Sequence, residues 1–331
     1  NPKPQTPNPK PQTPFFLFHV MHSMKYNEAR KTIMGLYLSK PDKNKTSSSG
    51  ENAQLRFGVS AMQGWRTSME DAHMAIPDLS AGISLFGVFD GHGGAEVARF
   101  CSKHFAEELK KNQNFLDGKF SSALEETFLK MDELLLMPEN QAELKQLKNQ
   151  GSDSNSAGCT ANVVLITKTE LICANAGDSR SYLYDCEGKT IALSSDHKPE
   201  LDEEKKRIKA AGGYVSEGRV NDNLNLSRAI GDFEFKKNKK LKPTEQIISA
   251  FPDIKTVKLE RKPRFLIIGC DGIWETLSPE KICETSYVKM RSASNVKLTS
   301  ILEGLLDNLV GKDTVDGVGC DNMSAILVEF K

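Results

Sequence analysis

Hydrophobic positions follow two periods along the chain and predict a mixture of helices and strands. Apolar side chains spaced three and four positions apart predict helices within residues 98–109, 124–135 and 298–309. Runs rich in β-branched and aromatic residues predict strands at 86–89, 162–167, 170–176, 180–184, 265–270 and 324–330. The three strands between residues 162 and 184 follow one another through tight turns, which favours antiparallel pairing. Strands grouped in this way, with helices between the groups, predict an α+β fold.

The N-terminal segment differs in composition from the rest of the chain. Residues 1–14 contain Asn-Pro-Lys-Pro-Gln-Thr-Pro twice, and linker-like composition continues to about residue 50. A Pro-rich repeat cannot bury a core, so we expect residues 1–33 to form a disordered or weakly ordered tail. The short apolar run at 15–22 lacks the small-residue cleavage pattern of a secretory signal.

Composition excludes several classes of protein. Lys plus Arg and Asp plus Glu number 44 each in the 331 residues, so no excess of positive charge favours nucleic acid. The seven cysteines form no C-x-x-C pair, which favours a reducing compartment and a cytoplasmic location. No apolar stretch approaches the roughly 18 residues of a membrane helix, so stable membrane insertion is not expected. Without a coiled-coil or exposed-strand signal, a monomer is expected.

A possible acylation site follows the tail. Met34-Gly35-Leu36-Tyr37-Leu38-Ser39 matches the pattern of an N-myristoylation site. The reaction needs a free amino group on Gly35, so it requires a form of the protein that begins at Met34. A chance match to this short pattern remains the alternative.

Acidic residues recur at the ends of the predicted strands. Asp90, Asp178 and Asp271 each come shortly after a strand, and Asp321 comes shortly before one. Each of them alone could be a turn residue. Together with the adjacent pair Glu70-Asp71 (residues 70–71), they form a surplus of carboxylates that would repel one another without cations. Oxygen ligands without His or Cys select Mg²⁺ or Mn²⁺ over zinc.

Two further readings of this region stay open. The carboxylates could form a structural or sensing metal site instead of a catalytic one, although the compact D-x-D-x-D-G loop expected of a calcium-binding module is absent. Arg66 could recognise an anion beside the carboxylates, or it could form a surface salt bridge with Glu70 if both lie on a helix.

The motifs around these residues resemble those of the protein phosphatase 2C (PPM) family, the metal-dependent Ser/Thr protein phosphatases. The resemblance spans roughly residues 34–331, which predicts one catalytic domain. Its motifs occur in the family's order: Gly64-Trp65-Arg66-Thr67-Ser68-Met69-Glu70-Asp71, Phe86-Gly87-Val88-Phe89-Asp90-Gly91-His92-Gly93-Gly94, Gly158-Cys159-Thr160-Ala161, Ala176-Gly177-Asp178-Ser179-Arg180, Ser195-Asp196-His197-Lys198-Pro199, Leu226-Ser227-Arg228-Ala229-Ile230-Gly231-Asp232, Cys270-Asp271-Gly272-Ile273-Trp274 and Asp321-Asn322-Met323-Ser324.

The resemblance implies a four-layer αββα sandwich, in which two antiparallel sheets are flanked by helices. It also implies a site for two Mg²⁺ or Mn²⁺ ions, with Asp90 bridging them. The other implied metal-site residues are Asp271 and Asp321 at the first ion, the Gly91 carbonyl and water-mediated Glu70 at the second, and Asp71 on metal-bound waters. By the same resemblance, Asp178 belongs to a weaker third site. Where the family commonly has Asp four residues after Asp271, this chain has Glu275, which puts that third site in doubt.

The implied reaction is hydrolysis of phosphoserine and phosphothreonine in phosphoprotein substrates. A metal-bridging hydroxide would attack directly, Arg66 would bind the phosphate, and His92 would act as general acid. Residues 198–226 resemble the family's flap, with Arg219 as a candidate substrate contact. The alternative function is a pseudophosphatase that only binds phosphoproteins.

Two charged runs are expected to be solvent-exposed surface and not functional sites. The run at 203–207 is expected to be a solvated helix face. The five lysines within 236–242 are expected to form a solvated loop, with a nuclear-import patch as the alternative.

Overall fold

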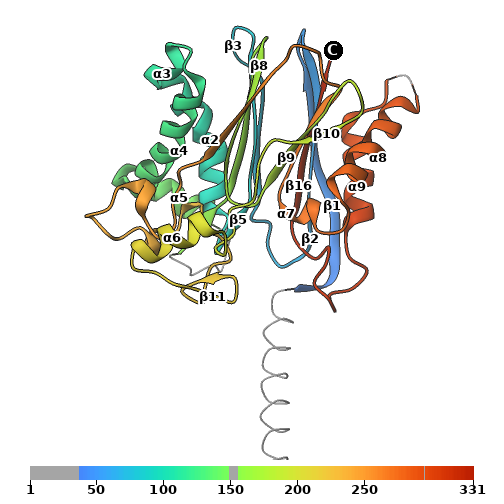
Figure 1. Cartoon of the computed structure of the whole chain (residues 1–331). Coiled ribbons are helices and arrows are strands. Elements are labelled where there is room, and N and C mark those ends of the chain that lie inside the picture. Colours follow the sequence, from blue (N-terminus) through green and yellow to red (C-terminus); the bar gives the residue numbers. More distant parts are fainter. Residues whose placement is uncertain (1–36, 149–155, 294) are drawn as a thin grey trace, which may run out of the picture.

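Two antiparallel β-sheets pack face to face, and helices cover the outer face of each (Figure 1). This computed structural model describes residues 37–148, 156–293 and 295–331. The predicted tail and the candidate acylation site at Gly35 lie outside the described residues. Within them, the predicted four-layer αββα sandwich is confirmed.

The first sheet has six strands and the second has five, and all the strand pairs in both are antiparallel. In spatial order, the first contains β1 (Tyr37–Glu51), β2 (Leu55–Arg66), β16 (Met323–Phe330), β15 (Phe265–Gly269), β9 (Arg180–Tyr184) and β10 (Thr190–Ala192). The second contains β14 (Asp253–Lys258), β8 (Glu170–Ala176), β7 (Ala161–Ile166), β4 (Ile83–Phe89) and β3 (Ala72–Ser80). Smaller ladders join β13 (Ile230–Gly231), β6 (Gly158–Cys159) and β5 (Gly91–His92), and pair β11 (Val215–Ser216) with β12 (Arg219–Val220).

The helices form two separate layers. Beside the second sheet lie α2 (Glu96–Lys111), α3 (Gln113–Leu116), α4 (Phe120–Leu136) and α5 (Gln141–Leu147), and beside the first lie α8 (Pro279–Arg291) and α9 (Leu298–Leu309) (Figure 1). Near one end of the sandwich, the shorter α6 (Asp202–Ala210) follows a loop and α7 (Asp271–Trp274) follows β15 almost directly. The three helices predicted from periodicity correspond to α2, α4 and α9, whose predicted apolar positions are buried.

Strand β4 shows why the sandwich has two cores. Successive side chains of a strand point to opposite faces, so Phe86 packs toward the first sheet, where its ring centroid lies 5.4 Å from that of Phe57 on β2. Phe89 points the other way and packs 6.1 Å from Phe105 on α2. Both faces of β4 are therefore buried, which explains its uninterrupted apolar run. This rigid strand ends at Asp90.

Two predictions about strands need correction. Residues 37–51 are not a linker: they form the edge strand β1, paired along β2 from Tyr37 to Glu51. Its polar side chains are tolerated because the edge of the sheet faces solvent. Residues 180–184 do form a strand, but β9 does not pair with β8. The chain crosses at Gly177-Asp178-Ser179 (residues 177–179) to the other sheet, where β9 pairs with β15 and β10.

The charged run at 203–207 is only partly a solvated face. Within α6, Glu204 is buried and its carboxylate lies 2.7 Å from both Arg207 Nη1 and Arg228 Nη2. These ion pairs tie α6 to the loop around Arg228. In the lysine run, Lys236 instead forms a 2.6 Å ion pair with Asp132 on α4, while its other lysines are exposed as predicted.

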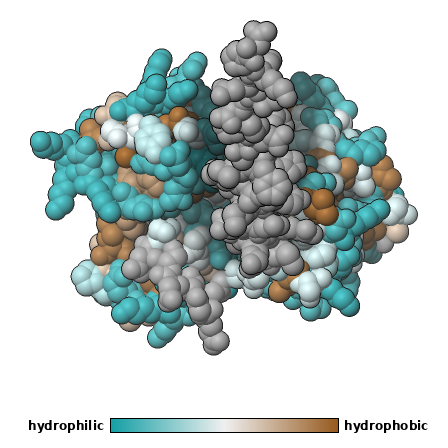
Figure 2. Space-filling view, turned by 90° about the horizontal axis from the view of Figure 1, so that it is seen from below, coloured by the Kyte–Doolittle hydropathy of each residue, from teal (hydrophilic) through white to brown (hydrophobic). Residues whose placement is uncertain are grey.

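No helix among the described residues is long and apolar enough to cross a membrane. Figure 2 views the molecule from the side on which β11 lies in Figure 1. The described surface there is mostly hydrophilic, with hydrophobic residues gathered in small groups.

Candidate functional site

The loops that carry the predicted acidic residues meet in a cleft of about 360 Å³. They come from both sheets: Asp90 lies between β4 and β5, Asp271 opens α7 directly after β15, and Asp321 precedes β16. The cleft is lined by Arg66, Thr67, Ser68, Glu70, Asp90, Gly91, His92, Gly93, Thr160, Asp178, Asn225, Leu226, Asp271, Asp321 and Asn322. The structure therefore brings together most of the site residues predicted from the sequence.

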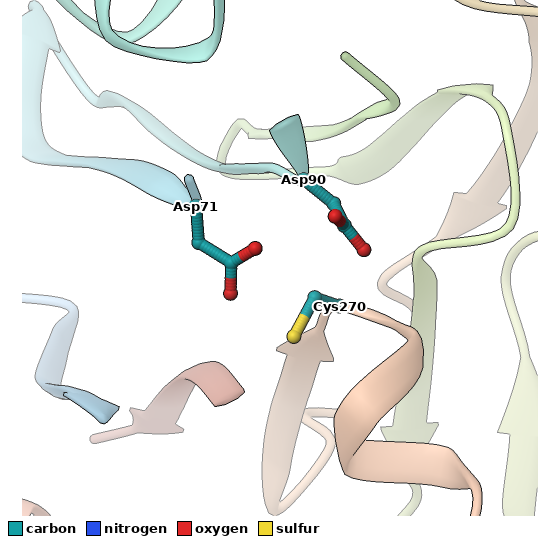
Figure 3. Close-up of side chains that lie close together, drawn as sticks. All are labelled: Asp71, Asp90 and Cys270. Atoms are coloured by element: carbon teal, nitrogen blue, oxygen red, sulfur yellow. The ribbon is translucent and has the colours of Figure 1, made fainter. Parts of the chain in front are cut away.

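Asp90 is held by its own backbone. The Thr160 N–H donates to the Asp90 carbonyl at 2.9 Å, and the Asp90 N–H donates to Thr160 Oγ1 at 3.3 Å. These bonds fix the position of Asp90 at the end of a buried strand. Figure 3 shows its side chain beside those of Asp71 and Cys270.

Seven side chains in the described residues form three overlapping groups that could hold a cation. In each group, one ligand atom per residue lies within 4.8 Å of the others. The groups are Asp71 with Asp90 and Cys270, Asp90 with Asp178 and Asp271, and Asp271 with Glu275 and Asp321. Asp90 and Asp271 each belong to two groups, so they connect the whole cluster.

The carboxylates of this cluster repel one another, and their ionised forms are disfavoured. Burial raises the pKa of Asp90 well above its usual value, and the nearby Asp271, Asp71 and Asp321 raise it further. Burial and the charge of Asp178 likewise raise the pKa of Asp271. Burial is also the main cause that raises the pKa of Asp71 to about 7. Like charges packed in this way are stable as anions only beside cations.

The donors fit a divalent cation that prefers oxygen. Asp71 is buried, and its Oδ2 has no hydrogen-bond partner in the described structure. A buried anionic oxygen without a partner is costly unless a cation or ordered water satisfies it. Carboxylates from several rigid elements, together with a backbone carbonyl, are suited to Mg²⁺ or Mn²⁺.

Gly91 and Glu70 meet at the edge of this cluster. A Cβ atom on Gly91 would lie 2.4 Å from the Glu70 carbonyl oxygen, so only glycine allows the two segments to approach this closely. The Glu70 carboxylate accepts hydrogen bonds from Ser68 Oγ at 2.9 Å and from the Gly94 N–H at 3.2 Å. The orientation of the Glu70 carboxylate is therefore set by the loop that contains Ser68 and the loop that contains Gly94.

Asn322 is a site residue that the sequence analysis did not single out. Its Oδ1 accepts from the Glu70 N–H at 2.9 Å, and its Nδ2 donates to the carbonyls of Gln63 and Ser68 at 2.8 and 3.0 Å. One side chain therefore fastens the loop that carries Arg66 and Glu70 to the start of β16.

Arg66 closes β2 and does not lie on a helix. Its Nη2 is 2.6 Å from Asp321 Oδ2, so the predicted alternative of a helical pair with Glu70 is wrong. Arg66 lines the cleft, where its partly exposed guanidinium can meet an anion. Arg219 lies elsewhere: it is exposed on β12, donates to the Asn223 carbonyl at 2.6 Å, and is not among the residues that line the cleft.

His92 has an acidic partner that the sequence analysis also missed. Its Nε2 lies 2.7 Å from Oδ2 of Asp232, which is buried and stands in the left-handed region at φ 51°. Burial disfavours the charged imidazolium, but the Asp232 carboxylate outweighs this and raises the pKa of His92. The tight turn at Gly231-Asp232 (residues 231–232) was the signal available in the sequence, but the contact joins residues 140 positions apart.

The two residues considered for a third metal site lie in different groups. Asp178 belongs to the group with Asp90 and Asp271, and its carboxylate lies 2.5 Å from Lys198 Nζ. Glu275 belongs to the group with Asp271 and Asp321, and it accepts from the Gly319 N–H at 3.3 Å.

The sequence also matches known proteins over most of its length. The family model described as Protein phosphatase 2C matches residues 55–318. The chain is 54% identical over 301 residues to Probable protein phosphatase 2C 4 of Paramecium tetraurelia. This match covers 90% of this chain and 99% of that protein. It is 53% identical over 301 residues to Protein phosphatase 2C 1 of the same organism, with 90% of this chain and 100% of that protein covered.

Solved structures show a similar fold. A phosphatase from a pathogenic strain of Toxoplasma gondii superposes with a TM-score of 0.70 at 25% identity, covering 87% of this chain and 96% of that one. A serine-threonine phosphatase 2C from Toxoplasma gondii also gives a TM-score of 0.70, at 19% identity, covering 87% of this chain and 99% of that one. Together with the family model and the close relatives, this similarity shows that the chain belongs to the protein phosphatase 2C family of serine/threonine protein phosphatases.

Proposed function

We propose that this protein hydrolyses phosphoserine and phosphothreonine in proteins by direct attack of water at a centre of two Mg²⁺ or Mn²⁺ ions. The observation that carries this proposal is the convergence of carboxylates around Asp90, whose pKa is raised by desolvation and by these neighbours. Such a cluster needs divalent cations to carry its charge. The membership of the chain in a phosphatase family supports the same conclusion.

Asp90 would bridge the two ions. Asp271 and Asp321 would complete one site, and the Gly91 carbonyl, with Glu70 and Asp71 acting through water, would complete the other. When bound, the two ions would activate the attacking water and neutralise the carboxylates, so that a phosphate dianion can enter. A weaker third ion would depend on Asp178, and it would have to compete with Lys198 for that carboxylate.

Arg66 would hold the substrate phosphate. Its guanidinium presents paired N–H donors that match phosphate oxygens. Its present partner, Asp321, is an expected metal ligand, so a bound cation would weaken this ion pair and release Arg66 toward the phosphate. The ion pair therefore keeps Arg66 in the cleft before substrate arrives.

His92 would protonate the leaving seryl or threonyl oxygen. With Nε2–H donating to Asp232, Nδ1 is the nitrogen from which a proton can pass to substrate, and the carboxylate stabilises the imidazolium before transfer. An alkoxide is a poor leaving group, so this protonation is expected to contribute about 10²–10⁴-fold.

Arg219 would act differently. Because it lies outside the cleft, we propose only that it contacts the peptide that flanks the phosphorylated residue. The alternative of a pseudophosphatase has no support from the comparisons.

The proposal is tested with phosphoserine and phosphothreonine peptides. Phosphate release should require Mn²⁺ or Mg²⁺, stop on addition of chelator and return with excess metal. Asp90→Ala should abolish turnover. Asp307→Ala, which removes an exposed carboxylate paired with Lys45 at the sandwich edge, should not. Metal-independent turnover, or equal activity in both variants, would refute the proposal.

A further inference from the structure

We propose that Cys270, Asp71 and Asp90 form a second kind of metal site, which binds a thiophilic divalent cation such as Zn²⁺ and thereby blocks the catalytic centre. The proposed Mg²⁺ or Mn²⁺ pair uses oxygen ligands only, whereas this site adds a sulfur. The inference rests on the proposed function in one respect: Asp90 would be shared by both sites.

The three side chains come from three different elements and lie close together (Figure 3). Asp71 precedes β3, Asp90 follows β4, and Cys270 follows β15. One carboxylate oxygen of each Asp and the Cys270 Sγ all lie within 4.8 Å of one another. Zinc bonds are about 2.3 Å to sulfur and about 2.0–2.2 Å to carboxylate oxygen. Three ligand atoms this close together could be reached by one ion.

The Asp71 carboxylate, which also supports the oxygen-ligand centre described above, favours a cation in the space between the three side chains. The Asp71 side chain is only 7% exposed, and its Oδ2 has no hydrogen-bond partner among the described residues. In Figure 3 the carboxylate faces the space that Asp90 and Cys270 border. A buried carboxylate oxygen that points into a space bordered by other ligand atoms favours a cation there.

One hydrogen bond would stabilise a metal-bound thiolate at Cys270, whereas burial and the nearby Asp71, Asp90 and Asp271 raise the pKa of the free thiol, so ionisation would need the bound cation. The Ser324 N–H donates to Sγ at 3.2 Å, and such a bond stabilises negative charge on sulfur. The Cys270 Sγ–H also donates weakly to the Asn322 carbonyl, with 3.5 Å between Sγ and the oxygen. Binding would replace the thiol proton, released to solvent, by the cation, with no change in oxidation state.

Selectivity follows from the sulfur. Thiolate ligands favour Zn²⁺ and other soft ions, whereas Mg²⁺ takes oxygen ligands almost exclusively. The ion would enter from the cleft that Asp90 lines. The Asp90 carboxylate would be a ligand both of Zn²⁺ at Cys270 and of the Mg²⁺ or Mn²⁺ pair. Binding of Zn²⁺ and binding of the pair should therefore exclude each other. Zinc is thus expected to inhibit the enzyme, and excess Mn²⁺ to relieve the inhibition.

The test uses Co²⁺ as a spectroscopic substitute for Zn²⁺ on the metal-free, full-length protein. A cobalt–thiolate bond gives a near-ultraviolet charge-transfer band that all-oxygen coordination lacks. We expect this band at one equivalent of Co²⁺, its loss on addition of Zn²⁺ and its absence in Cys270→Ser. The control Cys186→Ser removes a partly exposed thiol that could bind metal adventitiously, and it should keep the band.

Inhibition gives a second measurement. The Zn²⁺ concentration for half-inhibition, at fixed Mn²⁺, should rise at least about tenfold in Cys270→Ser relative to Cys186→Ser. No cobalt–thiolate band in the unmodified protein, or a band that persists in Cys270→Ser, would overturn the proposal. Because the spectrum needs no turnover, a Cys270-dependent band in a protein without phosphatase activity would contradict the proposed function and leave this site standing.

Discussion

Gly158→Ala should uncouple the proposed general acid from its carboxylate without removing either group. A Cβ atom on Gly158 would lie 2.3 Å from Asp232 Oδ2 and 2.7 Å from His92 Nε2, the two atoms that form the 2.7 Å contact. Ordinary contacts of a methyl group are about 3.5–4.0 Å. One partner must therefore move by about 1 Å, which lengthens the contact beyond hydrogen-bonding distance.

The size of the effect should depend on the leaving group. General acid catalysis contributes about 10²–10⁴-fold when the leaving oxygen is a poor one. We therefore expect kcat for a phosphoserine peptide to fall about 10²-fold or more in Gly158→Ala. For p-nitrophenyl phosphate, whose leaving group needs little protonation, kcat should fall only a few-fold.

The assay compares kcat for both substrates at saturating Mn²⁺. The matched control is Gly304→Ala within α9, where the added methyl would meet only the flexible end of Lys289 at 3.2 Å. It should leave both rates unchanged. Overpacking at Gly158 can also cost about 1–3 kcal/mol of stability, so Asp232→Asn, which keeps the volume, serves as a second variant. An equal loss on both substrates, in both variants, would refute the assignment of His92 as general acid.

Three further predictions concern stability and substrate binding. The pKa of Asp71 is raised to about 7, so its contribution to the stability of the metal-free fold is present below about pH 4 and lost as pH rises through about 7. The Tm of the metal-free protein should fall over this window, and less steeply in Asp71→Asn; parallel curves would contradict this. Arg66→Ala should lower kcat/KM for phosphopeptides about 10–100-fold through a loss of about 1.5–3 kcal/mol of charged hydrogen bonding, and an unchanged kcat/KM would exclude phosphate binding by Arg66. Glu204→Ala leaves the largely buried Arg207 without a carboxylate partner and Arg228 with only the exposed Asp253, so urea unfolding should show a loss of about 3–5 kcal/mol, whereas a loss below 1 kcal/mol would show that the Glu204 ion pairs are dispensable.

Local patterns in the sequence predicted the elements that carry the site. The apolar run before Asp90 predicted a buried strand because both of its faces pack, one on each core. The heptad-like spacing of residues 298–309 predicted a helix because one of its faces is buried. Composition misled for residues 37–51, because an edge strand needs no apolar face.

Contacts between distant residues could not be predicted in the same way. Periodicity identified residues 180–184 as a strand but could not show which sheet it joins, since both sheets offer a buried face. The charge pattern of α6 could not reveal that Glu204 is buried, because its partner Arg228 lies 24 positions further along the chain. Asp232 was missed for the same reason: its importance comes from His92, which the fold brings to it.

The clustering of Asp90, Asp178, Asp271 and Asp321 was expected from a recurring strand-end pattern and a family resemblance. The pattern alone allowed a turn residue at each position. The four aspartates form a site because they converge in one cleft, which four separate turn residues would not do. Burial there also raises the pKa of Asp90 and Asp271.

Anomalous diffraction from crystals grown with Mn²⁺ tests the central claim most directly. The proposed centre predicts two manganese peaks that share the Asp90 carboxylate, one beside Asp271 and Asp321 and the other beside the Gly91 carbonyl. Both peaks should disappear in Asp90→Ala crystals. No peak within coordination distance of Asp90 at saturating Mn²⁺, or a single ion that does not touch Asp90, would contradict the account.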